Sequence, residues 1–126
     1  MNKLIETIDL TKIYGEKETS VTALKSINTA FNENQFTAIM GPSGSGKSTL
    51  LHCLAGLDKV TGGSILINGV DLASLNDKEL TKMRRDSFGF VFQAFNLIPT
   101  LTAEENITLP SSIAGKKPEE EWVKQV

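Results

Sequence analysis

Apolar and polar residues alternate near the start of the chain, where β-branched residues are frequent. Because side chains two positions apart lie on one face of a strand, this pattern predicts strands over residues 4–10 and 21–31. The polar segment 16–20 between them predicts the tip of a hairpin. A further strand is predicted over 64–67, followed by Asn68-Gly69, a strong hairpin-turn signal. These strands predict an antiparallel β subdomain.

A second type of hydrophobic pattern begins at residue 36. The short apolar run 36–40 is typical of a buried parallel strand. Residues 48–57 predict a helix with one apolar face, formed by Leu50, Cys53, Leu54 and Leu57, and with Gly56 as a stop signal. The phenylalanines at 88, 90 and 92 alternate, which predicts another core strand. Strand, loop, helix and strand in this order are typical of an α/β fold.

Capping patterns predict three more helices. Ser74-Leu75-Asn76-Asp77 resembles the start of a capping box, as does Thr102-Ala103-Glu104-Glu105. The second of these helices is expected to end at about Leu109, because Pro110 follows. Pro118 and the three glutamates after it predict a third helix start, since acidic side chains suit the positive end of a helix.

The most informative segment lies between the run 36–40 and the helix that follows. It fits the pattern G-x-x-x-x-G-K-[ST] at Gly41, Gly46, Lys47 and Ser48. Glycines let the backbone approach a ligand, and successive N–H groups form a concave nest for phosphate oxygens. Lys47 is expected to reach the β- and γ-phosphates of a nucleotide, and the Ser48 hydroxyl to ligate Mg²⁺. The predicted binding residues are Gly41, Pro42, Ser43, Gly44, Ser45, Gly46, Lys47, Ser48 and Thr49.

Composition excludes several other functions. The chain has 126 residues and a formal net charge of −2 with interspersed signs, so nucleic acid is not an expected partner. No apolar run approaches the ~20 residues of a membrane-spanning helix, so direct membrane insertion is not expected. The single cysteine, Cys53, gives no internal disulfide.

Four stretches in this order resemble the ATP-binding cassette (ABC) transporter ATPases. Residues 41–49 match the family's Walker A motif, and Lys12-Ile13-Tyr14-Gly15 resembles its A-loop. Residues 62–69 resemble the hairpin after the Walker A helix. Residues 90–106 are similar to the Q-loop region of the lipoprotein-release and macrolide-export branch.

The resemblance implies a P-loop NTPase fold of which this chain is the N-terminal portion, with an incomplete, mostly parallel core sheet. It implies ATP and Mg²⁺ as ligands, stacking of Tyr14 on adenine, and contact of Gln93 with Mg²⁺ or the attacking water. Lys47 and Gln93 are thus the candidate catalytic residues. The signature motif, the Walker B strand and the switch histidine have no counterpart in the 126 residues, which are therefore expected not to hydrolyse ATP alone.

The resemblance also implies partners and a location. A membrane permease is expected to dock on the region Phe95–Asn106, and a second nucleotide-binding subunit to complete a homodimer. The protein would then be cytoplasmic and peripheral on the inner face of the cell membrane. Two alternatives stay open: a nucleotide-binding fragment without turnover, and another P-loop phosphotransferase such as a small kinase.

Overall fold

The computed structural model describes residues 2–126. The chain forms two compact units, one extending through Leu80 and the other comprising Thr81–Val126. Among the described residues, no helix combines the length and the apolar character needed to cross a bilayer.

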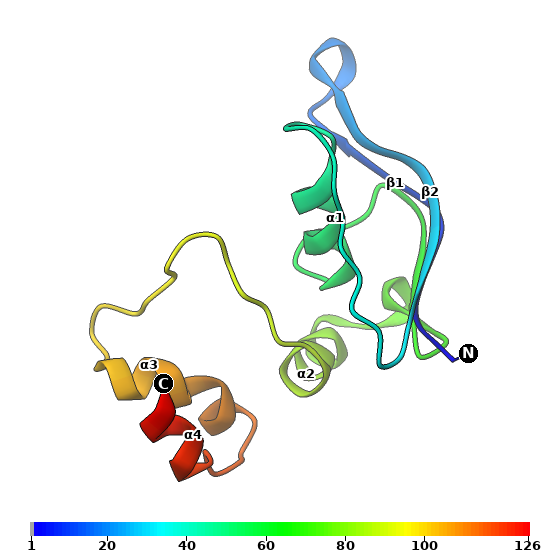
Figure 1. Ribbon diagram of the computed structural model, residues 1–126. Coiled ribbons are helices and arrows are strands. Elements are labelled where there is room, and N and C mark those ends of the chain that lie inside the picture. Colours follow the sequence, from blue (N-terminus) through cyan, green and yellow to red (C-terminus); the bar gives the residue numbers. More distant parts are fainter. Residues whose placement is uncertain (1) are drawn as a thin grey trace. The chain divides into compact units, whose positions relative to one another are not determined.

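The first unit is built on a four-stranded antiparallel sheet. Its strands are β1 (Lys3–Tyr14), β2 (Val21–Asn32), β3 (Gly62–Ile67) and β4 (Val70–Asp71), in the spatial order β2-β1-β3-β4. The long β1–β2 hairpin turns through the short 3₁₀ helix η1 (Lys17–Thr19) (Figure 1). Asn68 and Gly69 both have positive φ between β3 and β4, as the predicted hairpin turn requires. The predicted antiparallel subdomain is confirmed.

A bulge bends the hairpin near its middle. The register of β1 and β2 shifts between Thr7 and Leu10, where Asp9 has a φ of 47°. Side chains replace the interrupted ladder: the Asp9 carboxylate accepts hydrogen bonds from Ser26 Oγ and Asn28 Nδ2, each at 3.0 Å. Asn28 Oδ1 in turn accepts the Asp9 N–H at 2.9 Å. The bulge is thus a specified bend, because its unpaired backbone is satisfied locally.

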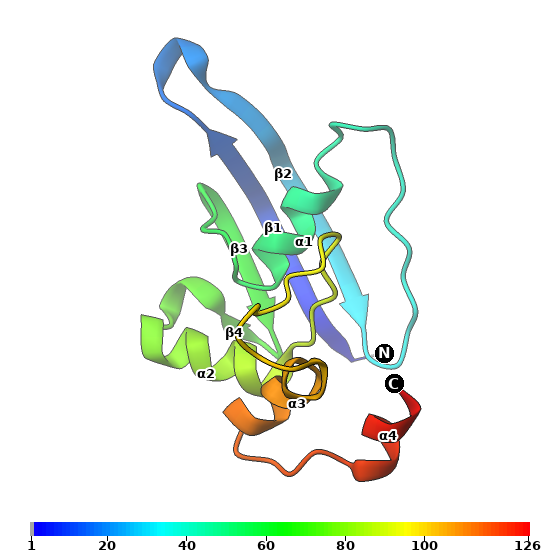
Figure 2. The same ribbon diagram turned by 90° about the vertical axis from the view of Figure 1, so that its left-hand side faces the viewer.

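Helix α1 (Lys47–Leu54) lies against one face of this sheet (Figures 1 and 2). The apolar core between them includes Leu10, Leu24, Cys53, Leu54, Ala55, Ile65 and Ile67, each no more than 7% exposed. At the end of α1 the Gly56 and Leu57 N–H groups donate to Cys53 and His52 carbonyls, at 3.0 and 2.9 Å. With Gly56 at positive φ, this is a Schellman motif, and the predicted stop signal is confirmed.

The first unit ends with the 3₁₀ helix η2 (Leu72–Ser74) and the start of α2 (Asp77–Ser87). A capping box forms at Asn76 and Glu79, two residues beyond the predicted one at Ser74-Leu75-Asn76-Asp77, because Ser74 belongs to η2. The Asn76 side chain accepts the Glu79 N–H at 2.8 Å, and the Glu79 carboxylate accepts the Asn76 N–H at 2.9 Å. Two helix-start donors are satisfied reciprocally in this way.

Both predicted core strands outside the antiparallel sheet are wrong. Residues 36–40 and 88–92 have no strand structure, and Phe36 and Met40 are 98% and 87% exposed. A parallel strand depends on hydrogen bonds from neighbouring strands. The described residues supply no such neighbour, so apolar content alone does not produce a strand there. The Phe90 and Phe92 rings instead contact each other, with centroids 4.5 Å apart.

The second unit contains α3 (Ala103–Ile113) and α4 (Glu120–Gln125). Thr102 caps α3, accepting the Glu105 N–H at 3.1 Å as its capping pattern predicts. The predicted end at Leu109 is wrong, because α3 continues through Pro110 to Ile113. A proline removes one helical hydrogen bond, and the helix then reaches a better stop at Gly115, whose φ is 70°.

Candidate nucleotide-binding site

The glycine loop runs directly into the first turn of α1. Gly46 is the N-cap, with a φ of 93°, and it lies so close to β2 that an added Cβ would meet the Ala23 carbonyl oxygen at 2.6 Å. Such a close approach is available to glycine alone. The loop is therefore anchored on the sheet at its last residue, with the N-terminus of α1 directed towards it.

The Lys47 side chain folds back over this loop. Its ammonium donates to the carbonyl oxygens of Gly41 and Pro42, at 2.8 and 2.7 Å, and to Ser45 Oγ at 3.2 Å. These three contacts close the loop around a positive charge. A cation enclosed by a loop at a helix N-terminus is suited to phosphate, because charge and helix dipole favour the same anion.

The two hydroxyl residues of the motif follow Lys47 in the first turn of α1. The Ser48 side chain is exposed, and Thr49 is partly covered. A hydroxyl beside a bound phosphate is a suitable ligand for Mg²⁺, which is held in proteins largely through substrate phosphates and a few oxygen ligands. The donor set of this site thus fits a nucleotide phosphate chain with its Mg²⁺.

The two positive-φ glycines of the loop differ in their surroundings, which gives a matched test. No atom lies within 4 Å of a Cβ added at Gly44, whose φ is 79°. We expect Gly44→Ala to lower the free energy of unfolding by about 1 kcal/mol through its backbone conformation alone. We expect Gly46→Ala to cost roughly 1–3 kcal/mol more, because its methyl group overlaps Ala23. Urea denaturation of both variants measures the difference, and equal losses would contradict the anchoring of Gly46 on β2.

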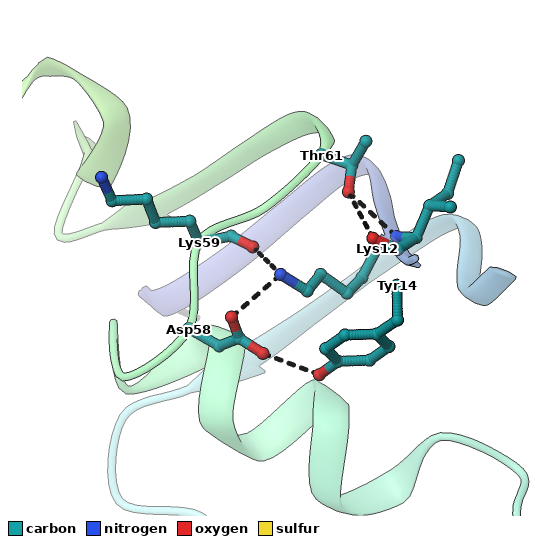
Figure 3. Close-up of polar contacts among 6 residues, drawn as sticks. Lys12, Tyr14, Asp58, Lys59 and Thr61 are labelled. Atoms are coloured by element: carbon teal, nitrogen blue, oxygen red, sulfur yellow. Dashed lines mark hydrogen bonds and ion pairs between the residues drawn. The ribbon is translucent and has the colours of Figure 1, made fainter. Parts of the chain in front are cut away.

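Tyr14, the last residue of β1, belongs to a polar network with the loop that follows α1 (Figure 3). Its hydroxyl donates to Asp58 Oδ2 at 2.7 Å. The other carboxylate oxygen of Asp58 accepts from Lys12 Nζ at 2.9 Å, and the same ammonium donates to the Lys59 carbonyl at 2.5 Å. Lys12 Nζ also lies 4.8 Å from the centroid of the Tyr14 ring, within the range of a cation–π contact.

The network sets the ionisation of its members. The pKa of Asp58 lies below its ordinary value because Tyr14, and then Lys12, donate hydrogen bonds to the carboxylate. The Asp58 carboxylate raises the pKa of Lys12 and that of Tyr14, while a hydrogen bond with Thr49 lowers the latter. At neutral pH Asp58 is therefore ionised, Lys12 is protonated and Tyr14 is neutral, as the contacts require.

Asp58 and Thr61 were not among the residues singled out from the sequence, and Lys12 entered only as part of the stretch Lys12-Ile13-Tyr14-Gly15, without a role of its own. Lys12 and Tyr14 are two positions apart in a strand, and so share a face, which is a readable signal. Asp58 carries no such signal, since 44 residues separate it from Tyr14. Thr61 adds a backbone restraint, because its Oγ1 accepts the Ile13 N–H at 2.9 Å (Figure 3).

The predicted site residues are divided between the two units. Tyr14 and residues 41–49 belong to the first unit, whereas Gln93 belongs to the second, in an exposed loop. The same exposed loop continues into the region Phe95–Asn106, with Phe95 94% and Leu97 66% exposed. The Asn106 side chain binds this region to α3: its Oδ1 accepts the Ile98 N–H at 2.8 Å and its Nδ2 donates to Thr102 O at 2.9 Å.

A glycine loop anchored on a sheet, followed directly by a helix and closed around a lysine, is the phosphate-binding arrangement of P-loop proteins. Comparison with known protein families shows to which group of P-loop proteins the chain belongs. The family model described as "ABC transporter" matches residues 24–126. The chain belongs to the ABC transporter family.

Similar proteins agree with this assignment. The chain is 49% identical over 117 residues to the macrolide export ATP-binding/permease protein MacB of Marinobacter nauticus, covering 93% of this chain and 18% of MacB. It is 48% identical to the lipoprotein-releasing system ATP-binding protein LolD of Geobacter metallireducens, and the match covers 93% of this chain and 52% of LolD. It is 51% identical to the ABC transporter ATP-binding protein MJ0796 of Methanocaldococcus jannaschii, and the match covers 85% of this chain and 46% of MJ0796.

Solved structures confirm the fold class. The dimeric structure of MJ0796 superposes with a TM-score of 0.85 at 48% identity, covering 96% of this chain and 53% of that chain. A second MJ0796 structure, described as a post-hydrolysis state bound to ADP and Pi, gives the same TM-score. The chain therefore has the fold of an ABC ATPase cassette, and it spans about half the length of LolD and MJ0796.

Proposed function

We propose that this chain binds MgATP through residues 41–49 and Tyr14, as the ATP-binding part of an ABC transporter. The single observation that carries the proposal is the closed loop, in which the Lys47 ammonium contacts Gly41, Pro42 and Ser45 at the N-terminus of α1. ADP and Pi in the related MJ0796 cassette support the same ligand class. In this arrangement Lys47 binds phosphate oxygens, Ser48 holds Mg²⁺, and Tyr14 stacks on the base.

Calorimetric titration with MgATP tests this proposal. Saturable binding that Lys47→Ala abolishes or severely weakens would support it. Heats no larger than those of dilution, from a protein shown to be folded, would overturn it.

ATP hydrolysis is the second part of the proposal and concerns the whole protein. Lys47 would stabilise the charge of the transferred phosphoryl group, and Gln93 would contact Mg²⁺ or the attacking water. Nucleotide binding without turnover is the alternative for the 126 residues alone, which contain no acidic pair at the end of an apolar strand. Steady phosphate release, measured beside binding, distinguishes the two.

We propose further that hydrolysis drives export or extraction of a substrate by a membrane permease. Relatives with 46–49% identity are named for macrolide export and lipoprotein release, and MacB is itself named as an ATP-binding/permease protein. The dimeric MJ0796 structure supports pairing with a second nucleotide-binding subunit. A protein with these partners would lie in the cytoplasm against the inner face of the membrane.

The region Phe95–Asn106 is the proposed docking surface for the permease. Phe95 and Leu97 are exposed, and the Asn106 side chain fixes the backbone beside them with hydrogen bonds to residues 98 and 102. A fixed loop with exposed apolar side chains is typical of a partner site, because exposed apolar area is otherwise avoided.

A cysteine at position 97 tests this surface by crosslinking in membranes that contain the permease. We expect Leu97→Cys to form a crosslink several times more efficiently than Val21→Cys, a control position that is 62% exposed on the first unit. The native Cys53 is 1% exposed and gives little background. Equal yields from positions 97 and 21 would place the docking surface elsewhere.

A further inference from the structure

From the network in Figure 3 we infer that Asp58, assisted by Lys12, is a positioning residue that holds the Tyr14 ring ready to receive a nucleotide base. The inference rests on the proposed function of Tyr14. It adds that base recognition depends on two side chains that themselves need not touch the nucleotide.

Asp58 and Lys12 both restrain the exposed ring of Tyr14. Tyr14 is 40% exposed at the end of β1, so core packing covers only part of its side chain. Asp58 fixes the far end of the side chain through the 2.7 Å hydrogen bond to the hydroxyl. Lys12 lies over the ring itself at 4.8 Å from the centroid. Lys12 thereby occupies one face of the ring, so in this inference the base stacks on the other face.

The position of Asp58 in the chain links Tyr14 to the glycine loop. Asp58 follows the Schellman motif that ends α1, and α1 begins at Lys47 of the phosphate loop. The Asp58–Tyr14 hydrogen bond thus connects the ring to the same helix that presents the loop to phosphate. A base and its phosphates are joined covalently, so fixing the ring relative to α1 prepares both contacts at once.

The two charged side chains that contact Tyr14 are themselves largely shielded from solvent. The Lys12 side chain is 11% exposed and that of Asp58 is 31% exposed. Lys12 Nζ has two further restraints in Asp58 and the Lys59 carbonyl, so its place over the ring is defined by several contacts. A side chain ordered in advance loses less freedom when ligand binds, which improves affinity without a new contact.

The test compares two ligands of the same protein, MgATP and Mg-tripolyphosphate, because only the first has a base. We expect Asp58→Ala to weaken MgATP binding roughly three- to tenfold, the cost of ordering one side chain, and to leave tripolyphosphate affinity unchanged. Asp58→Asn should lose less, because its amide oxygen still accepts the Tyr14 hydroxyl. Tyr14→Phe should weaken MgATP binding mildly and leave tripolyphosphate binding unchanged. Combining Asp58→Ala with Tyr14→Phe should weaken MgATP binding little further.

Asp86→Ala is the matched control, since it also breaks an ion pair of 3.0 Å, with Arg85, but in the second unit. Equal weakening of both ligands by Asp58→Ala and by Asp58→Asn would overturn the inference, because a general loss of α1 structure acts on phosphate binding too. Unchanged or tighter MgATP binding by these variants would overturn it as well. If the unmodified protein bound neither ligand, the proposed function would fail. That result differs from the results above, which concern the Asp58 variants of a protein that does bind.

Discussion

Lys47→Ala is expected to weaken MgATP binding by about 100-fold. A hydrogen bond to a charged group contributes roughly 1.5–3 kcal/mol, and a factor of ten corresponds to 1.4 kcal/mol. The phosphate loop also loses the group that closes it, since the Lys47 ammonium contacts Gly41, Pro42 and Ser45. We therefore expect tripolyphosphate binding to fall with MgATP binding, while the free energy of unfolding changes little.

Calorimetry with both ligands measures this effect, and Lys25→Ala is the control. Lys25 is an exposed lysine of β2 in the same unit, so its removal changes the net charge equally. We expect Lys25→Ala to bind both ligands as the unmodified protein does. Identical MgATP affinities for the Lys47 and Lys25 variants would exclude residues 41–49 as the phosphate site.

Tyr14→Ala is expected to weaken MgATP and MgGTP binding alike, by about ten- to a hundredfold. Stacking of a base on an aromatic ring is worth roughly 1–3 kcal/mol and tolerates any base, because every base has a π-face. The loss should therefore leave the ratio of the two affinities unchanged. Tripolyphosphate has no base, and its affinity should not change.

Competition binding with the two nucleotides and tripolyphosphate tests this prediction. Removing Tyr14 leaves Asp58 and Lys12 paired with each other at 2.9 Å, so gross unfolding is not expected. MgATP affinity equal to that of the unmodified protein would show that Tyr14 is not the base-binding residue, whatever its place in the network.

Local sequence patterns predicted much of the first unit. Alternation in residues 4–10 and 21–31 gave β1 and β2, and Asn68-Gly69 gave the β3–β4 turn. Gly56 gave the end of α1, and the spacing of Gly41, Gly46 and Lys47 located a loop that closes on the Lys47 ammonium, the proposed phosphate site. These features act between residues a few positions apart, so the relevant interactions are encoded within a short segment.

Tertiary structure decided the rest. Residues 36–40 are as apolar as a buried strand, yet they form no strand and Phe36 and Met40 are exposed, because a parallel strand exists only where other segments offer it hydrogen bonds. Asp58 became a partner of Tyr14 because α1 and its Schellman turn return the chain to the end of β1. A single sequence records which side chains are present, but contacts between positions 44 residues apart depend on how the intervening helix packs on the sheet.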